Sequence, residues 1–484
     1  MFPATRIELT WASIVLMVGL ALVCSPALGG AVIYVDDDAP NDPGPGDPLV
    51  SDPAEDGSSA HPFDALQEGI TAAQEGDTVL VGNGYYRGMG NMNLYLDKTL
   101  TLRSAQGASQ CVIDCQSMGR GLWIVGDAIV EGFTILNGLA DGTIGGGGIY
   151  CEYGSPTIAR CTISANQAPA CDDGGGGILC SAATPQITRC RITGNSTNAH
   201  GGGVCADNDS HPVLTDCVIS GNSGDVTGGV AVIGPTGATL RGCVVLDNQS
   251  NLAGGLGGAG FMVRSCTIAG NTGFWAGGIY IVGDITLIGS TVSRNNGVGI
   301  NIWEAVGSEI RNCIFWGNSG EITAGGVLVV SYSDIQGGWG GGGGNNIVED
   351  PLFVAPLSGD YHLSPGSPCI DAGDPDFAPE PGETDVDGEL RVWDGDGDGL
   401  ARVEMGSDEL GGPGGAPRRG DTNCDGAVDF DDINPFVAAL VSRENYEALY
   451  PWCNWFTGDV DGNGSVDFDD INPFVACLVA GRCP

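Results

Sequence analysis

The chain has 484 residues, enough for two or three domains with a large core, so its length does not restrict its structural class. Its 83 glycines and only 16% charged residues are typical of a turn-rich chain and disfavour helix-rich folds. The formal net charge of −42 excludes nucleic acid and anionic membrane surfaces as partners and favours divalent cations.

The N-terminal segment 1–30 predicts export. It carries Arg6, an apolar run from Trp11 to Val23 and then small residues. This order is typical of a secretory signal peptide, and the run is shorter than the roughly 20 residues that span a bilayer. We expect a secreted, extracellular or cell-surface protein with no transmembrane anchor; an uncleaved N-terminal anchor is the alternative.

A repeat runs through residues 131–350. The unit Cys-Thr-Ile-x-x-Asn, or a close variant, ends at asparagines that are 23 to 29 residues apart. A coil of this length fits three short strands, and strands of successive coils stack about 4.8 Å apart. The sequence therefore predicts a mainly β chain, a parallel β-helix solenoid. The eight asparagines are Asn137, Asn166, Asn195, Asn222, Asn248, Asn271, Asn295 and Asn318.

The repeated positions predict structural roles. The asparagines suit left-handed corners, and their stacked amides can bond one coil to the next. The cysteine and the isoleucine of each unit, such as Cys161 and Ile163, share one strand face and are expected in the core. We interpret the cysteine ladder mainly as core packing, with occasional disulfides between coils as the alternative.

Both ends of the solenoid need covering. Residues 31–130 are expected to hold an N-terminal cap and the first coils. In this region Phe63, Leu66, Ile70 and Ala73 lie on one face of a predicted helix. The Asp- and Gly-rich segment 351–410 is expected to form the C-terminal cap.

Four segments resemble secreted bacterial right-handed β-helix proteins. They are the stretch 34–38 (Tyr-Val-Asp-Asp-Asp), the predicted cap helix, the strand 132–135 (Gly-Phe-Thr-Ile) and the closing segment 364–371. The resemblance covers roughly residues 32–411. That superfamily includes pectate lyases and other polysaccharide-processing enzymes, so it implies a right-handed coil and polysaccharide as the partner.

After a linker at 411–419, residues 420–484 contain two matching loops offset by 38 residues. Each loop has oxygen ligands at positions 1, 3, 5, 9 and 12, glycine at position 6 and a backbone carbonyl at position 7, the spacing that wraps Ca²⁺. An amphipathic helix follows each loop, and we expect the two helical faces to bury against each other. The predicted ligands are Asp421, Asn423, Asp425, Ala427, Asp429 and Asp432, then Asp459, Asp461, Asn463, Ser465, Asp467 and Asp470.

This segment resembles a type I dockerin, a small all-α module with paired EF-hand-like loops, in which aspartate also stands at position 12. The resemblance implies a cohesin-like partner; a cell-surface component is the alternative. Cys424, Cys453, Cys477 and Cys483 suggest two disulfides. A further acidic run, 385–398, begins like a calcium loop but has Met405 at position 12, so a weaker cation site and a solvated acidic turn both remain open.

No catalytic site is evident from the sequence. Lys98 is the single lysine, so a lyase base would have to be an arginine; the candidates are Arg160, Arg189, Arg191, Arg241 and Arg264, near Asp172, Asp173, Asp207, Asp209 and Asp216. Asp172 and Asp173 are a weak carboxylate pair for a glycoside hydrolase. We expect an exported, calcium-binding β-helix protein that binds or degrades extracellular polysaccharide. A non-catalytic structural or adhesive surface protein is the alternative, and enzyme activity stays open between lyase, hydrolase and none.

Overall fold

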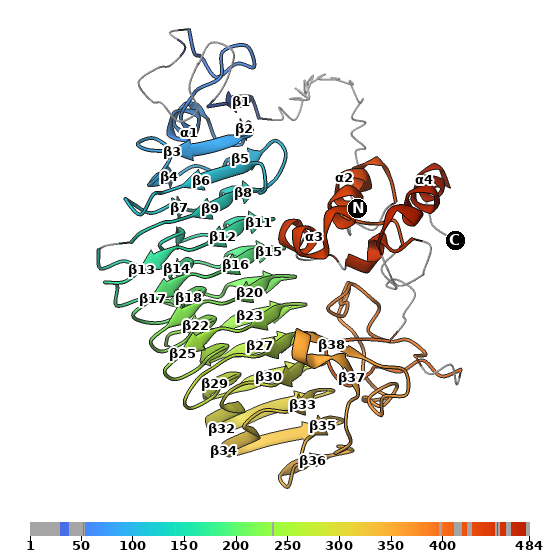
Figure 1. The fold of residues 1–484 in the computed structure, drawn as a ribbon. Helices are drawn as coiled ribbons and strands as arrows, with labels where there is room; N and C mark the ends of the chain where they lie inside the picture. The colour runs from blue at the N-terminus through green and yellow to red at the C-terminus, as the bar shows by residue number, and fades with distance from the viewer. Residues whose placement is uncertain are drawn as a thin grey trace, which may run out of the picture.

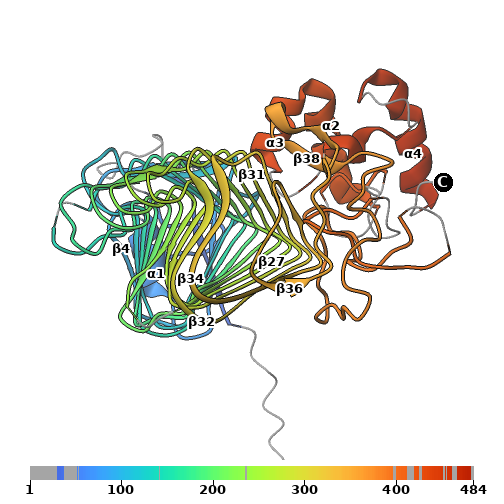
Figure 2. The same cartoon turned by 90° about the horizontal axis from the view of Figure 1, so that it is seen from below.

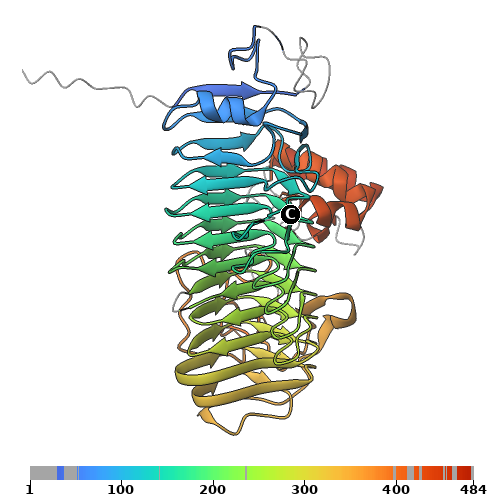
Figure 3. The ribbon, with the colours of Figure 1, turned by 90° about the vertical axis from the view of Figure 1, so that its left-hand side faces the viewer.

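A rod of stacked parallel coils forms most of the protein (Figure 1). The computed structural model describes residues 30–37, 52, 54–140, 142–234, 237–395, 399–410, 419–423, 428–450, 453, 455–460 and 466–480. The predicted signal peptide and most of the predicted linker lie outside these residues. Viewed from the side, the strands of successive coils lie one above another in register (Figure 3). Within the described residues, no helix has the length and apolarity needed to cross a membrane.

Four rows of strands make the walls of the rod, which Figure 2 shows from below. Row 1 contains β4 Leu94–Leu96, β7 Leu122–Val125, β10 Ile149–Glu152, β14 Ile178–Ser181, β18 Val204–Asp207, β22 Val230–Val232, β26 Leu256–Gly258, β29 Ile279–Val282 and the first parts of β32 Val298–Arg311 and β34 Gly320–Ser331. Row 2 contains β1 Val32–Val35, β2 Thr78–Val81, β5 Thr101–Ser104, β8 Ile129–Glu131, β11 Thr157–Ala159, β15 Gln186–Thr188, β19 Val213–Thr215, β23 Ala238–Arg241, β27 Phe261–Arg264, β30 Ile285–Ile288, the later parts of β32 and β34, and β36 Gly342–Gly344.

Rows 3 and 4 complete the coils. Row 3 contains β3 Gly84–Arg87, β6 Cys111–Asp114, β9 Thr134–Leu136, β12 Thr162–Ser164, β16 Arg191–Thr193, β20 Val218–Ser220, β24 Val244–Leu246, β28 Thr267–Ala269, β31 Thr291–Ser293, β33 Ile314–Trp316 and β35 Asp334–Ile335. Row 4 contains β13 Gln167–Ala168, β17 Ser196–Thr197, β21 Ser223–Gly224 and β25 Gln249–Ser250. A middle coil thus has four strands where the sequence predicts three, because a residue with positive φ, such as Arg160 at 52°, turns the chain between rows 2 and 3.

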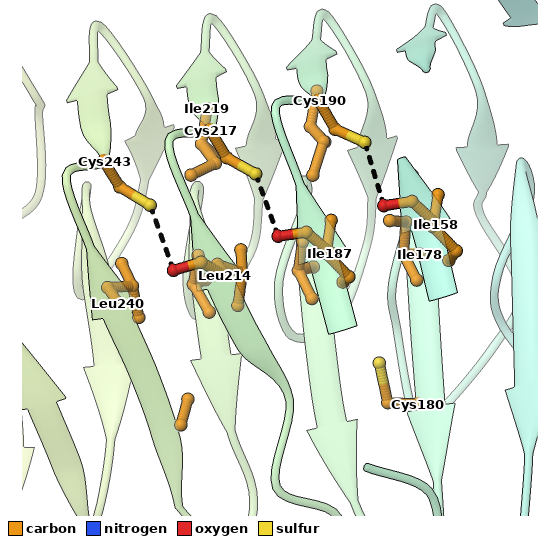
Figure 4. Close-up of a cluster of buried hydrophobic side chains, with 14 of the residues drawn as sticks. Ile158, Ile178, Cys180, Ile187, Cys190, Leu214, Cys217, Ile219, Leu240 and Cys243 are labelled. Carbon is orange, nitrogen blue, oxygen red and sulfur yellow. Dashed lines mark hydrogen bonds between the residues drawn. The ribbon is translucent and has the colours of Figure 1, made fainter. Parts of the chain in front are cut away.

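The cysteine ladder packs in the core, as predicted. The thirteen cysteines from Cys111 to Cys369 are all buried. In several repeat units the thiol donates to a backbone carbonyl of the preceding coil, for example Cys190 Sγ to Ile158 O at 3.4 Å and Cys217 Sγ to Ile187 O at 3.3 Å (Figure 4). These thiols therefore act as small apolar groups that make only weak hydrogen bonds.

The asparagine ladder is confirmed as a hydrogen-bonded column. Asn222 Nδ2 donates to Ile192 O at 2.8 Å and to Asn248 Oδ1 at 2.9 Å, and its own Oδ1 accepts from Asn195 N at 2.9 Å. The left-handed corner, however, lies one residue earlier, at positions such as Gly221 with φ 62°. The chain therefore turns at the residue before the asparagine, and the asparagine side chain supplies the hydrogen bonds between coils.

The first predicted unit is shifted by one residue. Thr134 pairs with Thr162 in neighbouring strands, so Asn137 aligns with Ala165 and occupies the left-handed corner at φ 55°. Gly138 takes the ladder position, and its backbone N–H donates to Asn166 Oδ1 at 2.7 Å. Asn137 is therefore a corner residue, and the side-chain ladder begins at Asn166.

Replacing Asn222 with alanine should destabilise the rod by about 3 kcal/mol, because it leaves buried backbone and amide groups without partners. Thermal unfolding of the full chain measures the loss. Asn198→Ala is the control, since Asn198 is exposed and its Nδ2 makes a single bond to Pro169 O at 2.8 Å. Equal effects of the two variants would contradict the structural role of the ladder.

The N-terminal region contains one short helix, α1 Leu66–Ala72, so Phe63 and Ala73 of the predicted helical face lie outside the helix. Leu66, Ile70 and Ala73 are fully or almost fully buried and join the core of the first coils. Lys98 Nζ donates to the carbonyls of Ile70 and Ala73 near the helix end, which fixes the helix against the coil. The single lysine is thus a structural group.

Residues 351–410 run along the outer wall of the rod. They include β37 Phe353–Ala355, the 3₁₀ turn η1 Pro356–Ser358 and β38 Asp360–Leu363. Leu363, Cys369 and Met405 pack on Ile314 of row 3, and the side chain of Thr267 bonds that of Ser407 at 2.8 Å. The segment expected as a cap therefore covers the wall formed by β28 to β33.

The tail, 420–484, contains α2 Ile433–Val441, α3 Arg443–Leu449 and α4 Ile471–Ala480, with 3₁₀ turns η2 Phe430–Asp432, η3 Trp455–Gly458 and η4 Phe468–Asp470. Phe436 of α2 and Phe474 of α4 stack with ring centroids 4.0 Å apart. The expected helical faces meet only in part, because other apolar residues of α2 and α4, such as Val437 and Val475, are exposed.

Candidate functional site

The outer face of row 1 carries side chains that could bind a ligand. Register places Tyr95, Trp123 and Tyr150 one above another on three successive strands. Trp123 lies 5.5 Å from Tyr95 and 5.6 Å from Tyr150, measured between ring centroids. Tyr95 is exposed, Trp123 half-buried and Tyr150 buried, so the stack runs from solvent into the wall.

Carboxylates follow these rings on the same face. Glu152 ends β10 and its Oε2 accepts from Trp123 Nε1 at 3.0 Å. Register aligns Glu152 with Ser181 and then with Asp207, the last residues of β14 and β18. Because adjacent strands lie about 4.8 Å apart, the Cα atoms of Glu152 and Asp207 are about 10 Å apart.

Asp207 has the properties of a functional carboxyl. It is 5% exposed, and its Oδ1 has no hydrogen-bond partner. Burial raises its pKa, although hydrogen bonds from Ser181 and Asn208 act in the opposite direction. A shielded carboxyl with a raised pKa is suited to hold or transfer a proton. Asp207 and Glu152 therefore form a carboxylate pair on one face, two strands apart.

In the sequence, Asp207 stands out only as a neighbour of the candidate arginines, and Glu152 does not stand out at all. Both residues stand three positions after the isoleucine or valine that follows the glycine run, at Ile149 and Val204. This shared spacing is the sequence signal by which both carboxylates could have been predicted to lie on one face. Asp172 and Asp173, the weak pair named from the sequence, lie in the loop before β14, where Asp173 O accepts from Cys205 Sγ at 3.0 Å.

None of the candidate arginines lies beside these carboxylates in the described rod. Arg160 pairs with Glu131 at 2.9 Å, and Arg189 with Asp216 at 3.7 Å. Arg241 pairs with Glu380 of the wall segment at 2.9 Å, and Arg264 pairs with Glu383 of the same segment at 2.7 Å. Arg191 lies on another wall, in row 3. The guanidinium of Arg120, which lies over the Tyr150 ring, donates to the carbonyls of residues 144–146. On the described part of this face Arg120 is therefore engaged by backbone carbonyls, and none of the five candidate arginines is placed to remove a proton from a sugar.

A second polar cluster lies in the wall segment around His362. Its Nδ1 lies 2.5 Å from Asp360 Oδ1 and its Nε2 lies 2.6 Å from Asp387 Oδ2, with Asp408 close by. Burial lowers the pKa of His362, but the charges and hydrogen bonds of Asp387 and Asp360 outweigh it and raise that pKa to about 12. Two ligands of one zinc ion would lie about 3.3 Å apart. The 2.6 Å contact is therefore a direct hydrogen bond from an imidazolium.

The aspartates of the acidic run 385–398 lie in different environments. Asp385 is buried, and its Oδ1 accepts the backbone N–H groups of Asp387 and Glu389 at 2.9 and 2.7 Å. Asp394 Oδ2 accepts from Gly399 N at 2.9 Å, while Asp396 and Asp398 lie outside the described residues. Burial raises the pKa of Asp385 and of nearby Glu404 to about 7 and about 8.

We expect residues 351–410 to become more stable as the pH falls from about 8 to about 5. Burial raises the folded-state pKa of Asp385, of Glu404 and of Asp408, the last to about 6. A group whose pKa is higher in the folded state than in the unfolded state stabilises the fold fully below its unfolded-state pKa. This stabilisation is lost as the pH rises through the folded-state pKa. Hydrogen exchange of this segment against pH measures the trend.

Glu404→Gln should flatten that pH dependence, since it removes one titrating group. Below about pH 4 the trend should reverse, because Asp360 and Glu383 have lowered pKa values and lose their ion pairs on protonation. Stability that rises steadily from about pH 5 to about pH 8 would contradict the argument.

The described parts of the predicted calcium loops have their first and last ligands buried: Asp421 and Asp432 in one loop, Asp459 and Asp470 in the other. Asp432 accepts the N–H groups of Asn423 and Asp429, each at 2.9 Å. Asp470 accepts that of Asp467 at 2.9 Å. The remaining predicted ligands, Asp425, Ala427, Asp461, Asn463 and Ser465, lie outside the described residues.

Comparison with known proteins identifies the architecture. Residues 120–284 and 228–347 match the family model described as a right handed beta helix region. The rod is a right-handed β-helix. No curated protein matches the chain.

Solved structures agree with this fold. The β-helix chain is similar to the crystal structure of pectate lyase Pel9A, with 14% identity and a TM-score of 0.51, over 78% of this chain and 96% of that one. The A-module of the Azotobacter vinelandii mannuronan C-5 epimerase AlgE6 aligns with 14% identity and a TM-score of 0.30, over 60% of this chain and 96% of that one. The similarity to Pel9A concerns the fold alone.

Proposed function

We propose that the β-helix binds or degrades extracellular polysaccharide. The observation that carries this proposal is the strip of aromatic rings and carboxylates along row 1, from Tyr95 through Trp123 and Tyr150 to Glu152 and Asp207. Flat rings accept the C–H faces of sugars, and carboxylates accept hydrogen bonds from hydroxyl groups. A long strip on a rigid rod suits a polymer better than a small molecule.

The same strip favours hydrolysis over β-elimination if the protein is an enzyme. β-Elimination needs a base beside the substrate carboxylate. On the described row 1 face the guanidinium of Arg120 is engaged by backbone carbonyls, and the candidate arginines lie elsewhere in ion pairs or in row 3. In a hydrolase, Asp207 would donate a proton to the leaving oxygen and Glu152 would activate water. Export, expected from the N-terminal segment, would bring the protein to such a substrate.

The tail is proposed to bind two Ca²⁺ ions and to attach the β-helix to a partner, a cohesin-like domain or a cell-surface component. Apolar side chains are exposed at equivalent positions of its two halves, 38 residues apart. They are Phe430, Ile433, Val437 and Val441 in the first half and Phe468, Ile471, Val475 and Val479 in the second. Exposed apolar faces of this kind are typical of interaction surfaces.

Assays of the full chain with calcium on acidic and neutral polysaccharides test the proposal. Release of reducing ends without absorbance near 235 nm would indicate hydrolysis, and Asp207→Asn and Glu152→Gln should each lower it at least about 100-fold. A rise in that absorbance would instead contradict the hydrolase assignment.

A non-catalytic structural or adhesive protein is the second candidate, favoured by the arginines that are held in ion pairs along the rod. Binding of a polysaccharide without any product, unchanged in Asp207→Asn, would select it. Neither binding nor product across the panel would refute the proposal.

A further inference from the structure

A second group of aromatic rings is exposed at the lower part of row 1. Trp275, in the loop before β29, and Trp303, in β32, stack with ring centroids 5.7 Å apart and planes 18° apart. Tyr280 of β29 meets Trp275 edge-on at 5.3 Å. Trp275 is 37% exposed and Trp303 50%. We call Trp275, Tyr280 and Trp303 the aromatic platform.

The platform is held in place by the coils. Val282 of β29 pairs with Trp303 of β32, and Asn301 Nδ2 donates to Trp275 O at 3.2 Å. In the column of paired residues that contains Tyr280, the two preceding coils carry the small residues Ala231 and Gly257. A large side chain therefore returns to this column at Tyr280. Large rings that are fixed by backbone contacts and open to solvent lose little conformational entropy on binding a ligand.

Charges around the platform are negative. Between residues 265 and 328 the chain has four acidic residues, Asp284, Glu304, Glu309 and Glu321, and only two basic ones. Arg311 pairs with Asp374 at 3.1 Å, and Arg294 stands on the turn after β31 of row 3, where its charge acts on Tyr361. An acidic polymer would thus meet Glu304, next to Trp303, without a compensating cation.

We propose that the aromatic platform binds a neutral polysaccharide, with the C–H faces of its pyranose rings stacked on Trp275 and Trp303. The inference rests on the proposed polysaccharide function and adds the place and the class of sugar. A chain of uronates is disfavoured because its carboxylates need arginine, lysine or a metal ion, whereas a neutral ring needs only flat apolar contact and hydrogen-bond acceptors.

Tryptophan fluorescence and calorimetry with the full chain test the platform. The probes are soluble neutral glucan, xylan and mannan oligosaccharides, compared with oligogalacturonate and oligomannuronate with and without calcium. We expect at least one neutral series to bind, and Trp303→Ala and Trp275→Ala each to weaken it about tenfold or more. Trp303→Phe should retain most of the affinity because it keeps a flat ring.

Tyr85→Ala is the matched control, since Tyr85 is an exposed aromatic residue on β3 of row 3 and should leave binding unchanged. Uronate binding that requires calcium and Trp303 would overturn the neutral class but keep the polysaccharide function. Sugar binding that ignores both tryptophan variants would overturn the platform, and so would self-association that Trp303→Ala abolishes. No sugar binding at all would refute the proposed function as well.

Discussion

Removal of calcium is expected to unfold residues 420–484 while the rod stays folded. Each loop buries carboxylates at its first and last ligand positions, and the core between the helices is small, centred on Phe436 and Phe474. Without cations those carboxylates repel one another. Saturation at 100 times the dissociation constant contributes about 2.7 kcal/mol per site, a large share of what so small a module can have.

Asp421→Ala combined with Asp459→Ala should reproduce this loss in the presence of calcium. Calorimetric titration of the full chain should lose both high-affinity calcium sites, and proteolysis should cut within the tail. Asp431→Ala is the control, because Asp431 is exposed and is not among the predicted ligands. Unchanged calcium affinity in the double variant would disprove the proposed site.

The second large effect is expected from Arg391→Met in the wall segment. The Arg391 side chain is fully buried, with Nη1 3.2 Å from Glu409 Oε1 and Nη2 donating to Gly406 O at 2.9 Å. Glu409 is equally buried, and burial holds its pKa well above the usual range even beside the arginine. Loss of the arginine leaves the buried Glu409 carboxyl without its partner, and breaking a buried pair costs about 3–5 kcal/mol.

Thermal unfolding together with hydrogen exchange of residues 385–410 measures this effect. Arg391→Met with Glu409→Leu should be less destabilised than Arg391→Met alone, because the second change removes the orphaned carboxyl. Arg160→Met is the control: its pair with Glu131 is exposed, and its loss should cost at most about 1 kcal/mol. Equal losses for Arg160→Met and Arg391→Met would show that the buried pair has no special role.

The solenoid can be predicted from the sequence because its repeats are local. The Cys-x-Ile spacing sets which residues face inward, and the 23- to 29-residue period sets the length of a coil. Asn222 and Cys217 were therefore assigned structural roles that their contacts confirm. The register error at Asn137 arose because one residue can shift a short motif without changing its composition.

Which charged residues meet depends on how the coils and the wall segment pack in three dimensions. The pairs Arg241 with Glu380 and Arg264 with Glu383 join segments more than 100 residues apart, which no spacing rule can foresee. Glu152 and Asp207 share a face because the coils stack in register, and Trp303 reaches Trp275 for the same reason. The repeat length and the inward-facing positions are encoded locally along the chain. Contacts between coils also depend on the lengths of the loops, which the repeat does not determine.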